Sequence, residues 1–319
     1  MTRRVILDID PGIDDALVMC VALFDPDVEI VALTSVGGDA PADVAARNMM
    51  GIVEFLDPAK LPRIGVGTDP EGVVPSESKT IHGINLSEGS YLPVAELCSP
   101  TPAEKVICDV VRHYPNQVTL LSCGPLTNIA KAFRRDKEIP FLVNRLFISG
   151  GTYEAPGNQT PCAEFNIRRD PTAAREVFAS SCTKTLVPLD VSNRMKFRLE
   201  HLAALPPKED KLGGFLRHIL LPAFRAYRQD RGMEQIYLQE LVAYFAMTRP
   251  ELFETTDAAG DVETSGTLTR GQTVFDRRTM PEWKRNMEVV TKIDSAAVCR
   301  EILAAFERSS QIIASRGGN

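Results

Sequence analysis

Four carboxylates lie close together near the start of the chain, in the stretch DIDPGIDD at residues 8–15. Carboxylates this close repel one another and raise each other's pKa unless a positive charge holds them ionised. If the strand persists, Asp8 and Asp10 point to the same side of it. Asp14 and Asp15 begin the next helix, where exposed backbone amides favour negative charge. Oxygen ligands without Cys or His favour calcium or magnesium over zinc as the counter-charge.

Each of these acids also has an ordinary structural explanation. Asp14 can cap a helix and Asp8 can form a turn, which are common tasks of aspartate. This explanation can account for any single acid, but it accounts poorly for four acids in one turn. The spacing also differs from that of an EF-hand loop, which needs acids at alternate positions, a sixth-position Gly and a twelfth-position Glu. The stretch therefore predicts a cation site of another kind.

The elements that must position this turn follow an alternating pattern. The predicted strands are the apolar runs Val5–Leu7, Ile30–Val36, Val118–Ser122, Leu146–Ser149 and Leu186–Leu189. The predicted helices between them cover residues 14–24, 41–56, 102–113, 126–135 and 170–179. Apolar runs separated by helices indicate a parallel sheet that is covered on both faces. We predict one α/β domain over residues 1–319, with a mostly parallel, Rossmann-like central sheet flanked by helices.

A polar turn follows each predicted strand. The turns are DIDPGIDD, Gly37-Gly38-Asp39, Gly124–Asn128, Gly150–Thr152 with Gly157-Asn158, and Asp190–Asn193. In an open parallel sheet the ligand crevice lies outside the carboxyl ends of the strands. We therefore expect the five turns to converge on one active site at that edge.

The remaining segments contribute a loop and two smaller regions. Residues 66–100 lack periodicity, are rich in Gly, Pro and Ser, and carry His82. Long loops of this kind are often functional, so we predict an active-site loop here. Residues 196–245 have a helical pattern, and residues 262–294 alternate like the strands of a hairpin. Residues 295–308 are predicted to form a closing helix.

The composition bounds the class of protein. Of the 319 residues, 44% are apolar and 24% are charged, as in ordinary globular domains. The net charge of −6, without a basic block, gives no electrostatic basis for a nucleic-acid partner. Seven scattered cysteines without a CxxC pair indicate reduced thiols rather than a disulfide framework or a zinc site. The N-terminus leaves no room for a signal peptide, so we expect a cytoplasmic protein without a membrane segment.

Three motifs together resemble a known family. They are DxDPGxDDA at the first turn, GPLTNIA at residues 124–130, and AEFN followed by DPxAA within residues 163–174. Over residues 5 to about 300, and in this order, they resemble the nucleoside hydrolases of the inosine–uridine-preferring type. The resemblance implies calcium-dependent hydrolysis of ribonucleosides to free base and ribose, in purine and pyrimidine salvage. It also implies a small-molecule nucleoside substrate and a homodimer or homotetramer.

The resemblance assigns roles by position. Asp10 would bind calcium and act as general base toward the calcium-bound water. Asp15 and the main-chain carbonyl of Cys123 would also bind calcium. The positions that contact the ribose are Asp14, Asn158, Glu164 and Asn166. His82 matches a loop histidine near the base, and we place it in the catalytic group.

The chain departs from the family pattern at two functional positions. Gly38-Asp39 stands where the family has Gly-Asn, so Asp39 adds an acid to the substrate-binding residues. Gln239-Glu240 stands where the family has a His-Asp pair. Glu240 can still bind calcium, whereas Gln239 can offer a hydrogen bond but cannot donate a proton as an acid. We expect metal and ribose binding to persist, with the leaving base protonated by another group or by none.

Two other functions are compatible with parts of the sequence. A DxD after the first strand also occurs in haloacid-dehalogenase-type phosphatases, which use a nucleophilic Asp and magnesium. That alternative leaves AEFN and the second Asp pair unexplained. The Gln239-Glu240 change favours a different alternative, a catalytically weak or inactive member that binds ribosides or calcium. Release of ribose from a panel of nucleosides separates this binder from an enzyme.

Overall fold

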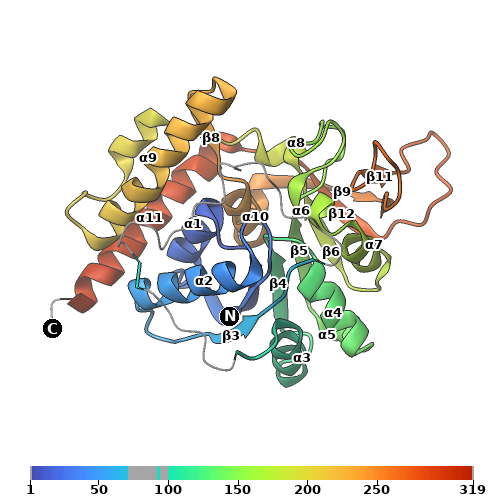
Figure 1. Ribbon diagram of the computed structural model, residues 1–319, viewed down its shortest axis with the longest axis horizontal. Helices are drawn as coiled ribbons and strands as arrows, with labels where there is room; N and C mark the ends of the chain where they lie inside the picture. Colours follow the sequence, from blue (N-terminus) through green and yellow to red (C-terminus); the bar gives the residue numbers. More distant parts are fainter. Residues whose placement is uncertain (1, 71–91, 94–99, 318–319) are drawn as a thin grey trace.

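A mostly parallel sheet of eight strands runs through the computed structural model, which describes residues 2–70, 92–93 and 100–317 (Figure 1). In spatial order the strands are β3 (Arg63–Val66), β2 (Val28–Ser35), β1 (Arg3–Ile9), β4 (Val118–Ser122), β5 (Arg145–Ser149), β6 (Lys184–Val187), β12 (Met287–Ile293) and β9 (Phe253–Ala258). All neighbours are parallel except β12 and β9. The strand order changes direction between β1 and β4. This switch point is where a ligand crevice is expected.

Helices cover both faces of the sheet (Figure 1). One face carries α1 (Ile13–Ala22), α2 (Ala42–Leu56), α9 (Lys211–Arg231), α10 (Gln239–Thr248) and α11 (Ser295–Gly317). The other carries α3 (Ala103–His113), α4 (Thr127–Arg135), α5 (Ile139–Leu142) and α7 (Pro171–Ala179). Strand β1 shows why both faces are covered. The side chains of Val5 and Leu7 pack in the apolar core on one face, and that of Ile6 packs in the core on the other face. Successive strand side chains point to opposite faces, so both faces of β1 are apolar and buried.

Short elements complete the described chain. They are the helices α6 (Phe165–Arg169) and α8 (Leu189–Ser192), the 3-10 turns η1 (Leu199–Ala204) and η2 (Pro250–Leu252), and two antiparallel pairs, β7 (Lys196–Arg198) with β8 (Gln235–Tyr237) and β10 (Gly260–Val262) with β11 (Thr273–Phe275).

The predicted α/β architecture is confirmed, with three corrections. The strand predicted to reach Leu189 ends at Val187, because Pro188 has no N–H for the ladder and α8 begins after it. Residues 262–294 do not form one hairpin, because β12, at the end of this region, belongs to the central sheet and lies between β6 and β9. The short strand β3 was not predicted, and neither were β7 and β8, which lie within the predicted helical region 196–245. Most of the predicted loop at 66–100, including His82, lies outside the described residues.

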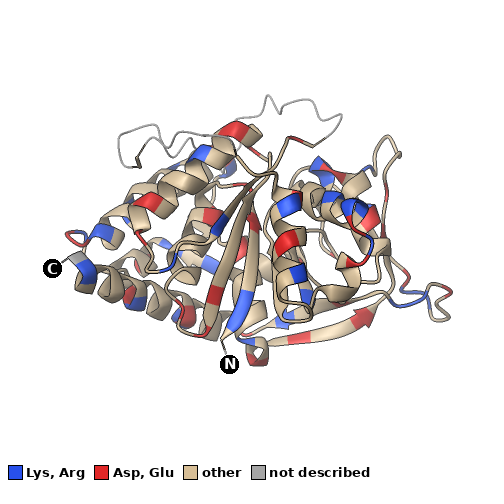
Figure 2. Ribbon diagram, turned by 90° about the horizontal axis from the view of Figure 1, so that it is seen from below, with Lys and Arg blue, Asp and Glu red and all other residues tan. Residues whose placement is uncertain are grey.

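Charged residues of both signs are mixed along the outer helices (Figure 2). Arg134 of α4 pairs with Glu176 of α7 at 2.6 Å, and Arg112 of α3 pairs with Glu138 at 2.9 Å. Exposed pairs of this kind contribute at most about 1 kcal/mol each, so the two apolar cores carry most of the stability. In the described part of the chain, no helix combines the length and apolar character that crossing a membrane requires.

Candidate active site

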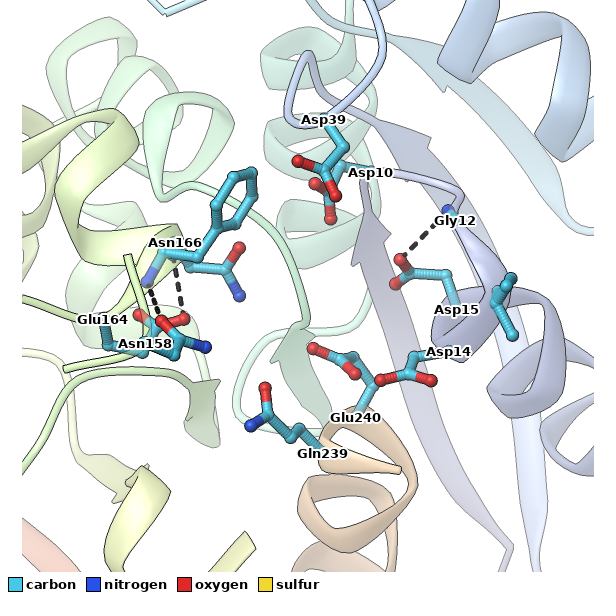
Figure 3. Close-up of a pocket in the computed structure, with 12 residues that line it drawn as sticks. Asp10, Gly12, Asp14, Asp15, Asp39, Asn158, Glu164, Asn166, Gln239 and Glu240 are labelled. Carbon is cyan, nitrogen blue, oxygen red and sulfur yellow. Dashed lines mark hydrogen bonds between the residues drawn. The ribbon is translucent and has the colours of Figure 1, made fainter. Parts of the chain in front are cut away.

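One pocket lies where the turns after β1, β2 and β5 meet the start of α10 (Figure 3). Its empty volume is about 430 Å³, part of which is open to solvent. The lining residues are Asp10, Gly12, Ile13, Asp14, Asp15, Asp39, Asn158, Glu164, Phe165, Asn166, Gln239 and Glu240. Of the predicted site residues that the structure describes, all but Cys123 are in this set. Gly12, Ile13 and Phe165 were not predicted.

Two glycines let neighbouring turns approach Asp10. A Cβ atom on Gly38 would overlap the carboxyl group of Asp10, so only glycine brings the turn after β2 this close. A Cβ atom on Gly124 would lie 3.1 Å from Oδ1 of Asp10, so the turn after β4 is also adjacent. The sequence Gly38-Asp39 thereby places a second carboxylate beside Asp10, as Figure 3 shows.

The carboxyl groups of this pocket oppose one another's ionisation. Burial raises the pKa of Asp10 well above its usual value, and the charges of Asp15 and Asp39 raise it further. Burial is also the main cause of the raised pKa of Asp15, followed by the charge of Glu240. The backbone N–H of Gly12 donates to Asp15 at 3.4 Å and opposes that shift only in part. The expected mutual repulsion is therefore present.

Asp14 and Glu240 form a hydrogen-bonded carboxyl pair at the edge of the pocket. Burial raises the pKa of Asp14 to about 6, and the hydrogen bond from Glu240 lowers it. The pKa of Glu240 is raised by burial and then by the charge of Asp14. The hydrogen bond with Asp14 also raises the pKa of Glu240. Two acids that are distant in the sequence are therefore hydrogen-bonded to each other at the pocket.

Asp8 supports the first turn from behind the pocket. It is fully buried, and its Oδ1 accepts hydrogen bonds from Thr34 Oγ1 at 2.6 Å and Asn128 Nδ2 at 2.8 Å. Asn128 also donates to the carbonyl of Ser35 at 2.9 Å. Burial raises the pKa of Asp8 to about 7, although both hydrogen bonds lower it. Asp8 and the GPLTN asparagine thus join β1, β2 and the start of α4.

Glu164 has a structural function, and its contact with ribose stays a prediction. Its carboxylate accepts hydrogen bonds from the backbone N–H groups of Gly151 at 2.9 Å, Asn166 at 2.9 Å and Ile167 at 3.1 Å. Gly151 has φ +70°, a conformation that favours glycine. Burial raises the pKa of Glu164, and the backbone hydrogen bonds lower it. Glu164 therefore caps α6 and holds the turn after β5 against it.

Both predicted ribose amides are held by backbone contacts. Asn158 Oδ1 accepts a hydrogen bond from the backbone N–H of Phe165 at 2.9 Å. Asn166 Nδ2 donates to the carbonyls of Cys123 at 2.9 Å and Ser149 at 3.1 Å. Cys123 is buried behind the pocket rather than in its lining, and its carbonyl contacts Asn166. That carbonyl keeps a second lone pair, so its role as a calcium ligand stays a prediction.

Two residues outside the predicted site shape the loop that carries Asn158. Asp190 accepts hydrogen bonds from the backbone N–H groups of residues 153–155 at 2.7, 2.7 and 2.9 Å. Thr273 of β11 accepts from the N–H of Thr152 at 2.9 Å and donates to its carbonyl at 2.5 Å. Asp190 directly follows the predicted strand Leu186–Leu189, which is a weak signal in the sequence. Thr273 has no such signal.

The oxygen donors of the pocket fit a hard cation by their chemistry. Oδ1 of Asp15 and Oε2 of Glu240 are buried and have no hydrogen-bond partner. Both groups have raised pKa values that a cation would reverse. Within the described residues, however, no three His, Cys, Asp or Glu side chains stand close enough together to form a metal-ligand group. The donors surround the pocket without yet converging on one point.

Known proteins resemble this chain in sequence and in fold. A family model described as inosine-uridine preferring nucleoside hydrolase matches residues 5–300. A non-specific ribonucleoside hydrolase, RihC, of Klebsiella pneumoniae is 36% identical over 92% of this chain and 95% of its own length. Uridine nucleosidase 1 of Arabidopsis thaliana is 32% identical over 86% and 82%.

A solved structure agrees with these sequence matches. The purine-preferring ribonucleoside hydrolase from Gardnerella vaginalis superposes with a TM-score of 0.89 at 25% identity, covering 97% of this chain and all of that one. Membership in this family also argues against the phosphatase alternative. By the family match and these relatives, the chain belongs to the inosine-uridine preferring nucleoside hydrolases, a family of N-glycosidases.

Proposed function

We propose that this protein hydrolyses the N-glycosidic bond of ribonucleosides to free base and ribose, using calcium held by Asp10, Asp15 and Glu240. The observation that carries the proposal is the pocket itself, in which buried carboxylates from the turn after β1, from α1 and from α10 face amides from the turn after β5 and from α6. The relatives named as ribonucleoside hydrolases and a uridine nucleosidase support this reaction.

The ribose would bind between the two sides of the pocket. Asp14 and Asp39 accept hydrogen bonds from sugar hydroxyls on one side. Asn158, Glu164 and Asn166 contact the sugar on the other side. Because Glu164 and both amides are already held by backbone groups, little side-chain freedom is lost when the sugar binds.

Proton transfer is assigned to Asp10. When bound, calcium would lower the pKa of a water molecule and orient two ribose hydroxyls. The oxygen of the attacking water bonds to C1′ while the bond from C1′ to the base nitrogen breaks. Asp10 accepts the proton that this water loses. The buried carboxylates stabilise the positive charge that develops on the sugar ring.

The second candidate function is a riboside or calcium binder with little turnover. The observation that favours it is Gln239, which stands at the pocket and has no acidic proton to give to a leaving base.

The test is incubation of the purified protein with purine and pyrimidine nucleosides, with and without calcium after chelator treatment. Calcium-dependent release of ribose supports the hydrolase. Nucleoside binding by calorimetry without any release of ribose supports the binder instead. The homodimer or homotetramer and the cytoplasmic location stay predictions, and light scattering checks the first of them.

A further inference from the structure

The side-chain amide of Gln239 has a defined direction. Its Nε2 donates a 2.9 Å hydrogen bond to Oδ1 of Asn193, which follows α8. Figure 3 shows the amide oxygen of Gln239 pointing toward the middle of the pocket and the nitrogen pointing away from it. The backbone N–H of Gln239 is directed to Asp14. Gln239 therefore presents a hydrogen-bond acceptor to the pocket, not a donor.

Acidic side chains dominate the rest of the described lining. Asp and Glu supply six of the twelve lining residues, and none of the twelve is Lys, Arg or His. Among the described lining residues, a departing base would therefore meet carboxylate and amide groups and no Lys, Arg or His side chain that could protonate it.

We infer that the site selects ribosides whose base carries a positive charge, such as N-alkylated purines or pyridinium heterocycles. This inference rests on the proposed hydrolase function and adds a substrate class to it. As the bond to C1′ breaks, its electron pair neutralises the positive ring nitrogen, so the base leaves neutral and needs no proton. The water oxygen bonds to C1′, and its proton passes to Asp10 and then to solvent. A neutral nucleoside would instead release an anion into a negative pocket, which is unfavourable.

Asn193 is the positioning residue in this scheme, because it decides which end of the Gln239 amide enters the pocket. A carboxylate at this position can only accept hydrogen bonds, so Asn193→Asp keeps the Gln239 nitrogen turned away. Asn193→Ala removes the partner and allows the amide to rotate and offer its N–H to the base. The two variants therefore differ in the direction of Gln239 and share the loss of the native asparagine.

The decisive experiment compares 7-methylguanosine with guanosine, which differ by one methyl group and a positive charge. We would measure kcat/KM for both in mildly acidic buffer with calcium, for the native protein, Gln239→His, Asn193→Asp and Asn193→Ala. The cationic substrate is intrinsically more labile, so the ratio of kcat/KM for 7-methylguanosine to kcat/KM for guanosine is compared among the variants. The change of this ratio decides the outcome. Gln239→His should raise turnover of guanosine about 10-fold or more by supplying an acid, and so lower the ratio. Asn193→Ala should also lower this ratio, whereas Asn193→Asp should leave the ratio unchanged.

A binding measurement gives a readout that does not depend on turnover. In calorimetry, the cation 1-methylnicotinamide should bind more tightly than neutral nicotinamide, and Asn193→Ala should reduce that preference. Equal ratios in all four proteins, or equal binding of the two probes, overturn the inference.

The riboside 4-nitrophenyl β-D-ribofuranoside separates this inference from the proposed function, because its leaving group needs no proton. If this riboside is hydrolysed but the ratio of kcat/KM for 7-methylguanosine and guanosine does not change among the variants as expected, the inference alone is overturned. No hydrolysis of any of the three substrates overturns the proposed function as well.

Discussion

Asn166 donates a hydrogen bond from Nδ2 to the carbonyl oxygen of Cys123 at 2.9 Å. A residue predicted to bind ribose thus contacts the carbonyl predicted to bind calcium. The same nitrogen donates to the carbonyl of Ser149, so one buried amide joins the turns that follow β4 and β5. Both predicted binding functions therefore depend on the position of this side chain.

Replacing Asn166 should affect stability and substrate binding together. Asn166→Ala leaves two buried carbonyls without this donor, so we expect the free energy of unfolding to fall by about 1–3 kcal/mol. The KM for nucleosides should rise because a ribose contact is lost. Urea unfolding and steady-state kinetics measure the two effects. Asn158→Ala is the matched control, since it should raise KM with little loss of stability, and an equal stability loss in both variants would contradict this account.

Asp10→Asn should separate catalysis from folding. Loss of the general base should lower kcat by about 10²–10⁴-fold. The metal-free variant should be more stable than the native protein, because one of the mutually repelling carboxyls is gone. Kinetics and thermal unfolding after chelator treatment check both. The same change at the exposed Asp43 is the control and should alter neither, whereas full activity in Asp10→Asn would sink the proposed mechanism.

Calcium should stabilise the native protein by binding the pocket carboxylates. At a free concentration about 100 times Kd, the expected gain in the free energy of unfolding is about 2.7 kcal/mol. Asp15→Asn should reduce this gain, because Oδ1 of Asp15 is a buried acceptor without a partner. Thermal unfolding across a calcium titration measures it. An identical gain in the native protein and Asp15→Asn would remove Asp15 from the ligand set.

The metal-free protein should lose stability as pH rises through the acidic range. Burial raises the pKa of Asp8 from 3.8 to about 7 and that of Asp14 from 3.8 to about 6. Between about pH 4 and pH 7 the folded state therefore binds more protons than the unfolded state, so the free energy of unfolding falls as pH rises. Urea unfolding with chelator at several pH values measures the slope. Asp8→Asn should flatten it, and a rising slope over this range would refute the assignment.

Asp190 should control substrate binding through the loop that carries Asn158. Asp190→Ala removes the acceptor of three backbone N–H groups, so KM should rise more than kcat falls. Asp190→Asn keeps one carbonyl oxygen and should have an intermediate KM. Steady-state kinetics of both variants check the order. A loss confined to kcat would place Asp190 in the chemical step instead.

Much of the fold and part of the site could be predicted because their signals are local. The apolar runs that form β1, β4 and β5 are short, continuous and bounded by turns, so they identify buried parallel strands without knowledge of their neighbours. The order of β12 and β9 could not be predicted in this way. Their pairing partners are distant in the chain, and alternation alone does not distinguish a hairpin from the edge of a larger sheet.

The sequence by itself determined the acidic turn and its family. Asp10, Asp14 and Asp15 lie within a few residues of one another, so strand and helix geometry alone brings them together. Only the tertiary structure decided how Gln239 is oriented, because its partner Asn193 lies 46 residues away in the chain. A sequence specifies the chemical groups of a side chain, whereas its direction depends on distant contacts. The carboxylates were therefore predictable, and the acceptor that faces the leaving base was not.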